Sequence, residues 1–212
     1  MSSRGIFISL EGIDGSGKTT LSLALLNYIK NQGLEVVNIR EPGGTAISEQ
    51  IRDLLLDVRN EGILPRTEAL LYAAARSQVV EEVIRPALAQ GKIVLADRFL
   101  DSTVAYQGFG RGLDVEFLTR LNELCTGGLF PDLTLLLDVD PAQGQQRRYK
   151  DIPDRLEKEG IEFQRRVREG YLYLARHDPG RIKIINAGLN LAEVVKLASV
   201  LVGSALSGQE VL

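Results

Sequence analysis

The chain has 212 residues, 44% of them hydrophobic and 25% charged, which is enough to bury the core of one domain. A formal net charge of −3 provides no overall basic field for nucleic acid or an anionic membrane, so neither is expected as a partner. The single cysteine, Cys125, cannot form an intramolecular disulfide. With the apolar Leu124 beside it, it predicts a buried thiol in a reducing cytoplasm.

Short β-rich segments alternate with longer helical periods along the whole chain. The first segment, GIFISLEG, is too short to span a membrane as a helix and lacks a cleavage-site pattern, which favours a strand. Helix caps are predicted at Gly33 and Gly91, and an interruption at Pro86. Strands are predicted at 5–12, 35–41, 92–98, 132–140 and 181–188, and helices at 19–31, 67–90, 115–125, 163–176 and 191–206.

This alternation predicts an α/β fold with a five-stranded parallel sheet flanked by helices on both faces. No repeat, low-complexity segment or flexible linker divides the sequence. We therefore expect a single domain over residues 1–212.

The segment EGIDGSGKTT contains a phosphate-binding loop of the form GxxxxGK[ST], between a predicted strand and a predicted helix. Backbone N–H groups of such a loop converge on phosphate, while Lys18 reaches the β and γ phosphates and the Thr19 hydroxyl ligates Mg²⁺. The carboxylate of Asp14 is unexpected among groups that bind anions. The predicted ATP-binding residues are Gly12, Ile13, Asp14, Gly15, Ser16, Gly17, Lys18 and Thr19.

Other motifs narrow the class, because GTPases, motors, transport ATPases and small-molecule kinases all use this loop. An NKxD-type guanine motif and an LSGGQ-type transporter motif are both missing from the sequence. Instead, polar residues follow the second and third predicted strands, at Glu41 and at Asp97-Arg98, where ligands bind in open α/β sheets. We expect Asp97 to orient a metal-bound water and Arg98 to hold a second phosphate. Tyr72 and Arg76, one helical turn apart, offer a stacking face and a hydrogen-bond donor.

Seven stretches in order from the first strand to Tyr171 resemble the thymidylate kinase family: EGIDGSGKTT, REPGGT, LLYAAARSQ, LADRFLDSTVAYQGFGRGL, PDLTLLLDVDP, DRLE and REGYL. The resemblance implies the three-layer fold of phosphate-loop nucleoside monophosphate kinases. It also implies transfer of the γ-phosphoryl group of ATP to dTMP with Mg²⁺, giving dTDP for dTTP synthesis. A homodimer packed through helices is implied as well, with which the apolar Leu70, Leu71, Val79, Val80, Val83 and Ile84 are compatible.

The resemblance also implies the roles of residues at the dTMP site. Tyr72 would stack on the base, Arg76 would donate to it, and Arg98 would hold the acceptor phosphate. Asp14 would accept a hydrogen bond from the sugar 3′-hydroxyl. Base and sugar would be lined by Thr103, Tyr106 and Gln107, with Tyr106 placed to crowd a ribose 2′-hydroxyl.

A lid at about residues 147–155 is a further implication. The phosphate loop has no extra base, so the lid would supply the additional catalytic arginine, as in bacterial-type members, from Arg147, Arg148 or Arg155. Lys18 and Arg98 complete the expected catalytic set, together with Glu41 in the environment of the acceptor phosphate or magnesium.

Two other functions are open from the residues. One is a kinase for UMP, CMP or dUMP, which would differ at the base pocket. Tyr72, Ala75 and Phe99 depart from the residues usual in the resembled family, which affects the hydrogen bonds expected around the base. The other is a nucleotide-dependent switch that transfers nothing to a small molecule. The single histidine, His177, is interpreted as a helix-end residue, because a largely dianionic phosphate monoester needs no general base.

Overall fold

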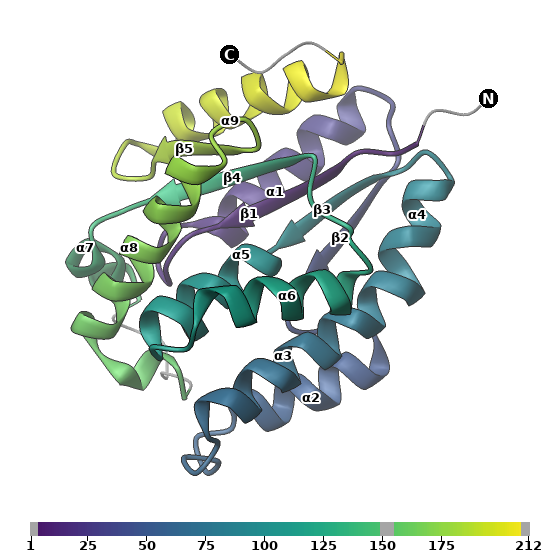
Figure 1. The fold of residues 1–212 in the computed structure, drawn as a ribbon. Helices are drawn as coiled ribbons and strands as arrows, with labels where there is room; N and C mark the ends of the chain where they lie inside the picture. Colours follow the sequence, from purple (N-terminus) through teal and green to yellow (C-terminus); the bar gives the residue numbers. More distant parts are fainter. Residues whose placement is uncertain (1–3, 149–154, 209–212) are drawn as a thin grey trace.

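The computed structural model describes residues 4–148 and 155–208, and in this part of the chain five parallel strands form one sheet (Figure 1). The order across the sheet is β2-β3-β1-β4-β5. The predicted five-stranded parallel sheet is confirmed, and its strands are β1 (Phe7–Glu11), β2 (Val36–Arg40), β3 (Ile93–Asp97), β4 (Leu133–Asp138) and β5 (Ile182–Asn186).

Helices cover both faces of the sheet, as expected for parallel strands buried on two sides. Helices α1 (Lys18–Asn31) and α9 (Leu191–Leu206) lie side by side on one face, and α8 (Ile161–His177) lies on the other (Figure 1). The strands are mostly apolar, with Phe7, Ile8 and Leu10 at 0% exposure in β1, and the buried hydroxyls of Ser9 in β1 and Thr134 in β4 hydrogen-bond each other at 2.7 Å. The remaining α-helices are α2 (Ala46–Leu56), α3 (Pro65–Val79), α4 (Arg85–Ala89), α5 (Leu100–Thr103), α6 (Val115–Thr126) and α7 (Pro141–Arg147).

The long helix predicted over residues 67–90 is interrupted. It comprises α3, a π-helical segment η1 (Val80–Ile84) and α4, with Pro86 near the start of α4. A proline cannot donate to the preceding turn, so the interruption predicted at Pro86 is confirmed and lies mainly in the residues before it. Gly91 ends this helical stretch with φ +75, as a left-handed cap requires.

Several helical segments were not predicted. Residues Leu100–Thr103 and the π-helical segment η2 (Val104–Gly110) contain QGFG, which is typical of a loop, yet they pack against α8. Close approach explains Gly110, since a Cβ there would lie 2.7 Å from the ring of Phe163 in α8. Helix α2 was also missed, although Thr45 caps it by accepting from the Ser48 N–H at 3.1 Å. The three-residue 3₁₀ turn η3 (Glu157–Glu159) leads into α8.

The prediction of a buried thiol at Cys125 is wrong. Leu124 is 81% exposed on α6, and Cys125 is only half-buried. His177 is confirmed as the last residue of α8. Within the described ranges no helix is long and apolar enough to cross a membrane. The centre of the expected lid, residues 149–154, lies outside the described residues.

Candidate active site

The phosphate loop joins β1 to α1, and its glycines are required by its shape. Gly12 has φ +142 and Gly15 φ +78, which are backbone conformations that favour glycine. Added Cβ atoms at these positions would lie 2.5 Å from the Leu137 carbonyl and 2.1 Å from the Gly144 carbonyl. The loop therefore fits closely between the end of β4 and α7.

Lys18 is the first residue of α1 and extends back into the loop. Its ammonium donates to the carbonyls of Gly12 and Ile13, both at 3.0 Å, and the residue is 7% exposed. Burial and the positive charge of Arg98 lower the pKa of Lys18 to about 8. The lysine is thus held where a triphosphate bound in the loop would meet it.

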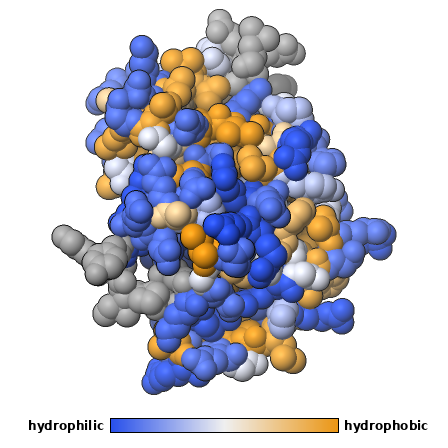
Figure 2. All heavy atoms as spheres, turned by 90° about the vertical axis from the view of Figure 1, so that its left-hand side faces the viewer, coloured by the Kyte–Doolittle hydropathy of each residue, from blue (hydrophilic) through white to orange (hydrophobic). Residues whose placement is uncertain are grey.

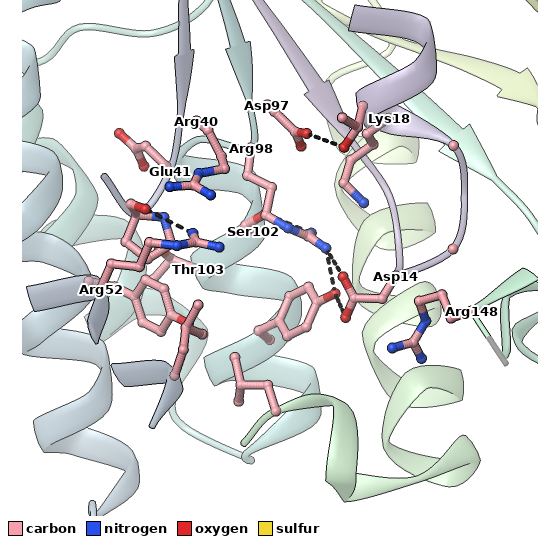
Figure 3. Close-up of a pocket in the computed structure, with 18 of the residues that line it drawn as sticks. Asp14, Lys18, Arg40, Glu41, Arg52, Asp97, Arg98, Ser102, Thr103 and Arg148 are labelled. Carbon is pink, nitrogen blue, oxygen red and sulfur yellow. Dashed lines mark hydrogen bonds and ion pairs between the residues drawn. The ribbon is translucent and has the colours of Figure 1, made fainter. Parts of the chain in front are cut away.

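Thr19 and Asp97 meet across the start of α1 and the end of β3. The Thr19 hydroxyl donates to the Asp97 carboxylate at 3.1 Å (Figure 3). Mg²⁺ prefers hydroxyl and carboxylate oxygens and is commonly bound by one or two protein groups, water and substrate phosphates. This pair fits a nucleotide-bound magnesium, and in the described residues no cluster of three or more metal-binding side chains was found.

Asp14 points toward Arg98, not toward the α1 end of the loop. Its carboxylate pairs with the Arg98 guanidinium (Figure 3). It also accepts from the Tyr106 hydroxyl at 3.1 Å and the Gln164 amide at 3.3 Å. Burial opposes ionisation, but the charges of Arg98 and Lys18 outweigh it and lower the pKa of Asp14 to about 2. The carboxylate in the loop is therefore compensated.

Arg98 comes directly after β3 and has φ +71, a left-handed conformation that is uncommon for a residue with a side chain. Its guanidinium donates to the Gly12 carbonyl at 2.9 Å and to the hydroxyls of Tyr106 and Tyr171 at 3.0 and 3.1 Å. The negative charge of Asp14 is among the causes that raise the pKa of Arg98, so the group stays charged. Arg98 therefore connects β3, the phosphate loop and α8.

A buried carboxylate, Glu11, lies behind Arg98 and was not singled out by sequence. It accepts from the Phe99 N–H at 2.8 Å, the Ser102 hydroxyl at 2.6 Å and the Tyr171 hydroxyl at 2.9 Å. Burial, and the nearby charge of Asp101, raise the pKa of Glu11 to about 7. Its position at the end of β1, directly before the phosphate loop, was the sequence feature that could have identified it as a site residue.

At the other end of the site Arg76 is 2% exposed and donates four hydrogen bonds to described groups. Its partners are Glu41 at 2.7 Å, Thr103 at 2.7 Å, Asn122 at 2.9 Å and the Phe99 carbonyl at 3.1 Å. Burial raises the pKa of Glu41, and its second oxygen, Oε1, has no hydrogen-bond partner among the described groups. Glu41 thus orients Arg76 and keeps one acceptor atom available.

Residues around the phosphate loop and residues around Arg76 line one cavity of about 520 Å³. Figure 2 views the molecule from the left-hand side of Figure 1, and the middle of this face is mainly hydrophilic. Seven basic and three acidic side chains line the cavity, so it favours a polyanionic ligand. The lining residues are Asp14, Gly15, Gly17, Lys18, Thr19, Thr20, Arg40, Glu41, Pro42, Arg52, Leu56, Tyr72, Arg76, Asp97, Arg98, Ser102, Thr103, Tyr106, Gln107, Arg147, Arg148 and Leu156.

The cavity brings together the residues that the sequence assigned to acceptor, metal and catalysis. Two arginines that received no role, Arg40 and Arg52, lie on the Glu41 side of it, opposite Arg148 (Figure 3). Arg52 belongs to α2, which was not predicted; the capping Thr45 before an amphipathic run was the signal that could have found it. Ser102, in the unpredicted α5, was missed for the same reason.

The expected lid arginines are separated in the structure. Arg147 ends α7, lines the cavity and donates to the Ala187 carbonyl at 2.9 Å, and Arg148 lines the cavity beside it. Arg155 does not line this cavity. It is 7% exposed, forms an ion pair with Glu68 at 2.6 Å and donates to the Leu55 carbonyl at 2.7 Å.

A parallel sheet with a phosphate loop after β1, an arginine after β3 and one cationic cavity between loop and helices defines a protein of the phosphate-loop nucleoside monophosphate kinase type. Comparison with known proteins specifies the family. The family model described as thymidylate kinase matches residues 10–198. The chain belongs to the thymidylate kinase family.

Curated relatives and a solved structure agree over most of the chain. The chain is 57% identical to a thymidylate kinase of Desulforudis audaxviator over 86% of this chain and 83% of the relative. It is 51% identical to one of Symbiobacterium thermophilum, over 90% and 89%. A crystal structure of thymidylate kinase from Ehrlichia chaffeensis has a TM-score of 0.76 at 37% identity, covering 93% of this chain and 99% of that one.

Proposed function

We propose that the chain transfers the γ-phosphoryl group of ATP to dTMP, giving ADP and dTDP, in the synthesis of dTTP. One observation carries the proposal: a single cavity extends from Lys18 and Thr19 to Tyr72 and Arg76, with Arg98 among its lining residues. Donor phosphates would occupy the loop end and the acceptor base the helix end. The acceptor phosphate would then lie at Arg98, within reach of the donor.

The base end has the chemistry that a pyrimidine requires. Tyr72 supplies an aromatic face, and the four bonds of Arg76 leave one of its five N–H groups to donate to a base oxygen. Tyr106 lies against Asp14 and Arg98, where it would crowd a ribose 2′-hydroxyl. Asp14, already next to Tyr106, would accept from the sugar 3′-hydroxyl.

Magnesium is proposed to lie at the Thr19 hydroxyl and the Asp97 carboxylate, the latter acting through a water. When bound, the ion neutralises charge on the β and γ phosphates. Thr19 and Asp97 hold one another in place, and Lys18 is positioned for the same phosphates.

Catalysis would rest on position and charge, not on a general base. The acceptor phosphate has a second pKa of about 6 and is largely dianionic at neutral pH. Two anions must therefore approach in line, and Lys18, Arg98, Arg147 and Arg148 line the cavity where they would do so. Glu41 would act on the acceptor side, by orienting Arg76 and offering its second oxygen.

A homodimer in the cytoplasm completes the proposal. Three of the apolar residues considered for an interface are 0% exposed and belong to the chain's own core: Val79, Val80 and Ile84. Leu70 of α3 is 49% exposed, and the neighbouring helices α2 and α6 expose further apolar side chains at Ile47, Leu54 and Leu124. An interface over α2, α3 and α6 is therefore proposed, and light scattering after size-exclusion chromatography measures the mass.

A coupled ADP-release assay across monophosphates tests the function. Purified protein, ATP and Mg²⁺ are combined in turn with dTMP, dUMP, UMP, CMP, dCMP, AMP and GMP. The proposal expects the highest kcat/KM with dTMP. A higher value with UMP or CMP would identify the alternative kinase, and ATP hydrolysis without phosphoryl transfer to any acceptor would identify the nucleotide-dependent switch.

A further inference from the structure

Glu68, in the first turn of α3, is a buried carboxylate to which neither the sequence nor the reaction gave a role. It is 0% exposed and does not line the 520 Å³ cavity. It accepts from the Gln107 amide at 3.0 Å and from two nitrogens of Arg111, each at 3.2 Å. Arg155 pairs with it at 2.6 Å. Three hydrogen bonds and one ion pair thus converge on one carboxylate, from two other segments of the chain.

The carboxylate decides which way the Gln107 amide points. The Glu68 carboxylate pairs with both the Arg111 and the Arg155 guanidinium groups, so its oxygens act as hydrogen-bond acceptors. The group of Gln107 that faces Glu68 is its NH₂, which donates to the carboxylate at 3.0 Å. Gln107 also lines the cavity, and its carbonyl oxygen, which does not face Glu68, is left to accept a hydrogen bond from a ligand there.

The surroundings of Glu68 hold it in this arrangement. Arg111 is anchored on its far side by Glu159 at 2.5 Å, and Arg155 by the Leu55 carbonyl at 2.7 Å. Both guanidinium groups are thereby fixed against the carboxylate, which limits its rotation. The orientation of Gln107 follows from a buried network, not from a single contact.

We propose that Glu68 is a positioning residue that selects the acceptor base through Gln107. The inference rests on the proposed function, which places the base at this end of the cavity. Thymine and uracil carry an N–H at position 3 and can donate to the Gln107 oxygen. Cytosine carries an unprotonated nitrogen there, so two acceptors would face each other. Arg76, with one N–H to donate, suits the 4-oxygen of thymine and opposes the 4-amino group of cytosine.

Glu68→Gln tests this selection with little change in side-chain shape. The new amide can donate as well as accept, so Gln107 is no longer held in one orientation. Dissociation constants for dTMP, dUMP and dCMP are measured by calorimetry. Affinity for dTMP and dUMP should fall about tenfold in parallel, whereas dCMP binding is retained or improved, so that the dTMP to dCMP ratio falls by at least tenfold. The dTMP to dUMP ratio should not change, since both bases share the N–H.

Glu159→Gln is the matched control, because it removes the charge of the outer partner of Arg111 at a residue that does not contact Gln107. If it lowers the dTMP to dCMP ratio as much as Glu68→Gln does, the role of Glu68 is only structural and the inference is overturned. Unchanged selectivity in Glu68→Gln overturns it equally. Should Glu68→Gln not fold, Glu68→Asp retains the charge but shortens the reach to Gln107, and the same drop in the ratio is expected.

Gln107→Ala separates this inference from the proposed function. If Glu68 acts through Gln107, adding Glu68→Gln to Gln107→Ala should leave the ratio where Gln107→Ala put it. A further independent drop overturns the inference alone. If Gln107→Ala by itself leaves dTMP affinity and selectivity intact, the base does not lie at this end and the proposed acceptor site is rejected with it.

Discussion

The guanidinium of Arg98 pairs with the carboxylate of Asp14, so that the residue following β3 is joined to the phosphate loop that follows β1. The same guanidinium donates to the Gly12 carbonyl at 2.9 Å. Because β1 and β3 are adjacent parallel strands, their carboxyl ends meet at one edge of the sheet. The contact joins the arginine proposed to hold the acceptor phosphate to the loop proposed to hold the donor.

Replacing Arg98 should affect one substrate more than the other. In Arg98→Ala the acceptor phosphate loses a charge-assisted hydrogen bond, and KM for dTMP should rise by about 10- to 100-fold. KM for ATP should change severalfold at most, because the variant loses only the hydrogen bond from Arg98 to the Gly12 carbonyl in the phosphate loop. Steady-state kinetics with each nucleotide varied in turn measure both. Equal losses for both nucleotides would contradict the acceptor role, and Arg98→Lys, which keeps the charge, should recover part of the loss.

Asp14 should contribute to recognition of the acceptor sugar. Asp14→Ala removes the proposed acceptor of the 3′-hydroxyl bond, so affinity for dTMP should fall about tenfold. An analogue of dTMP without the 3′-hydroxyl provides the control, because wild type and variant should bind it with more similar affinity. Calorimetry with both nucleotides checks this. A variant that binds dTMP normally and loses only ATP would show that Asp14 serves the donor instead.

Lys18 should take up a proton when ATP binds at alkaline pH. Its pKa in the free protein is lowered to about 8, so near pH 9 most molecules carry a neutral Lys18. The negative charge of a triphosphate favours the ammonium and raises this pKa again. Calorimetry of ATP binding in buffers of different ionisation enthalpy should give uptake approaching one proton at pH 9 and much less at pH 7. Lys18→Arg, charged at both pH values, should show no such difference.

Glu11 should make the folded protein less stable as pH rises toward neutrality. Its folded pKa is raised from 4.5 to about 7, so between these values the native state binds more protons than the unfolded chain. Unfolding free energy therefore decreases with increasing pH across this window, by up to about 3 kcal/mol from this one group.

Urea denaturation of wild type and Glu11→Gln at pH 5 and pH 8 measures that effect. Glutamine does not ionise, so the difference in unfolding free energy, wild type minus variant, should fall from pH 5 to pH 8. A constant difference would mean that Glu11 keeps one charge state throughout. Glu11→Gln also changes the contacts with Ser102 and Tyr171, and this change shifts the stability of the variant at both pH values. The test is therefore how the difference between the two proteins changes with pH, not how stable either protein is.

The arginines at the end of α7 should act on the chemical step. Arg147→Ala and Arg148→Ala together should lower kcat by a hundredfold or more, with smaller changes in either KM, if they stabilise charge only in the transition state. Single variants identify which matters, with Arg147→Ala also losing its bond to the Ala187 carbonyl. An unchanged kcat in the double variant would rule out this catalytic role.

Arg155→Ala should mainly lower the thermal unfolding temperature, because Arg155 is bound to Glu68.

Local patterns determined much of the fold. Apolar strands and their spacing predicted the five strands, and GxxxxGK[ST] between the first strand and first helix located the loop with Lys18 and Thr19. Helix α9 begins and ends at the predicted residues, since its periodicity is regular and Asn190 caps it. No helix was predicted for the glycine-rich segment around Gln107, because its π-helical form depends on close packing against α8.

The pairing of charges was decided only by tertiary structure. Sequence gave no means to see that Asp14 pairs with Arg98, that Glu41 pairs with Arg76, or that Arg155 pairs with Glu68, since the partners lie between 35 and 87 residues apart. A motif specifies which groups are present and which backbone geometry they have. Which charge neutralises which depends on strand order and helix packing, and these bring distant residues to one edge of the sheet.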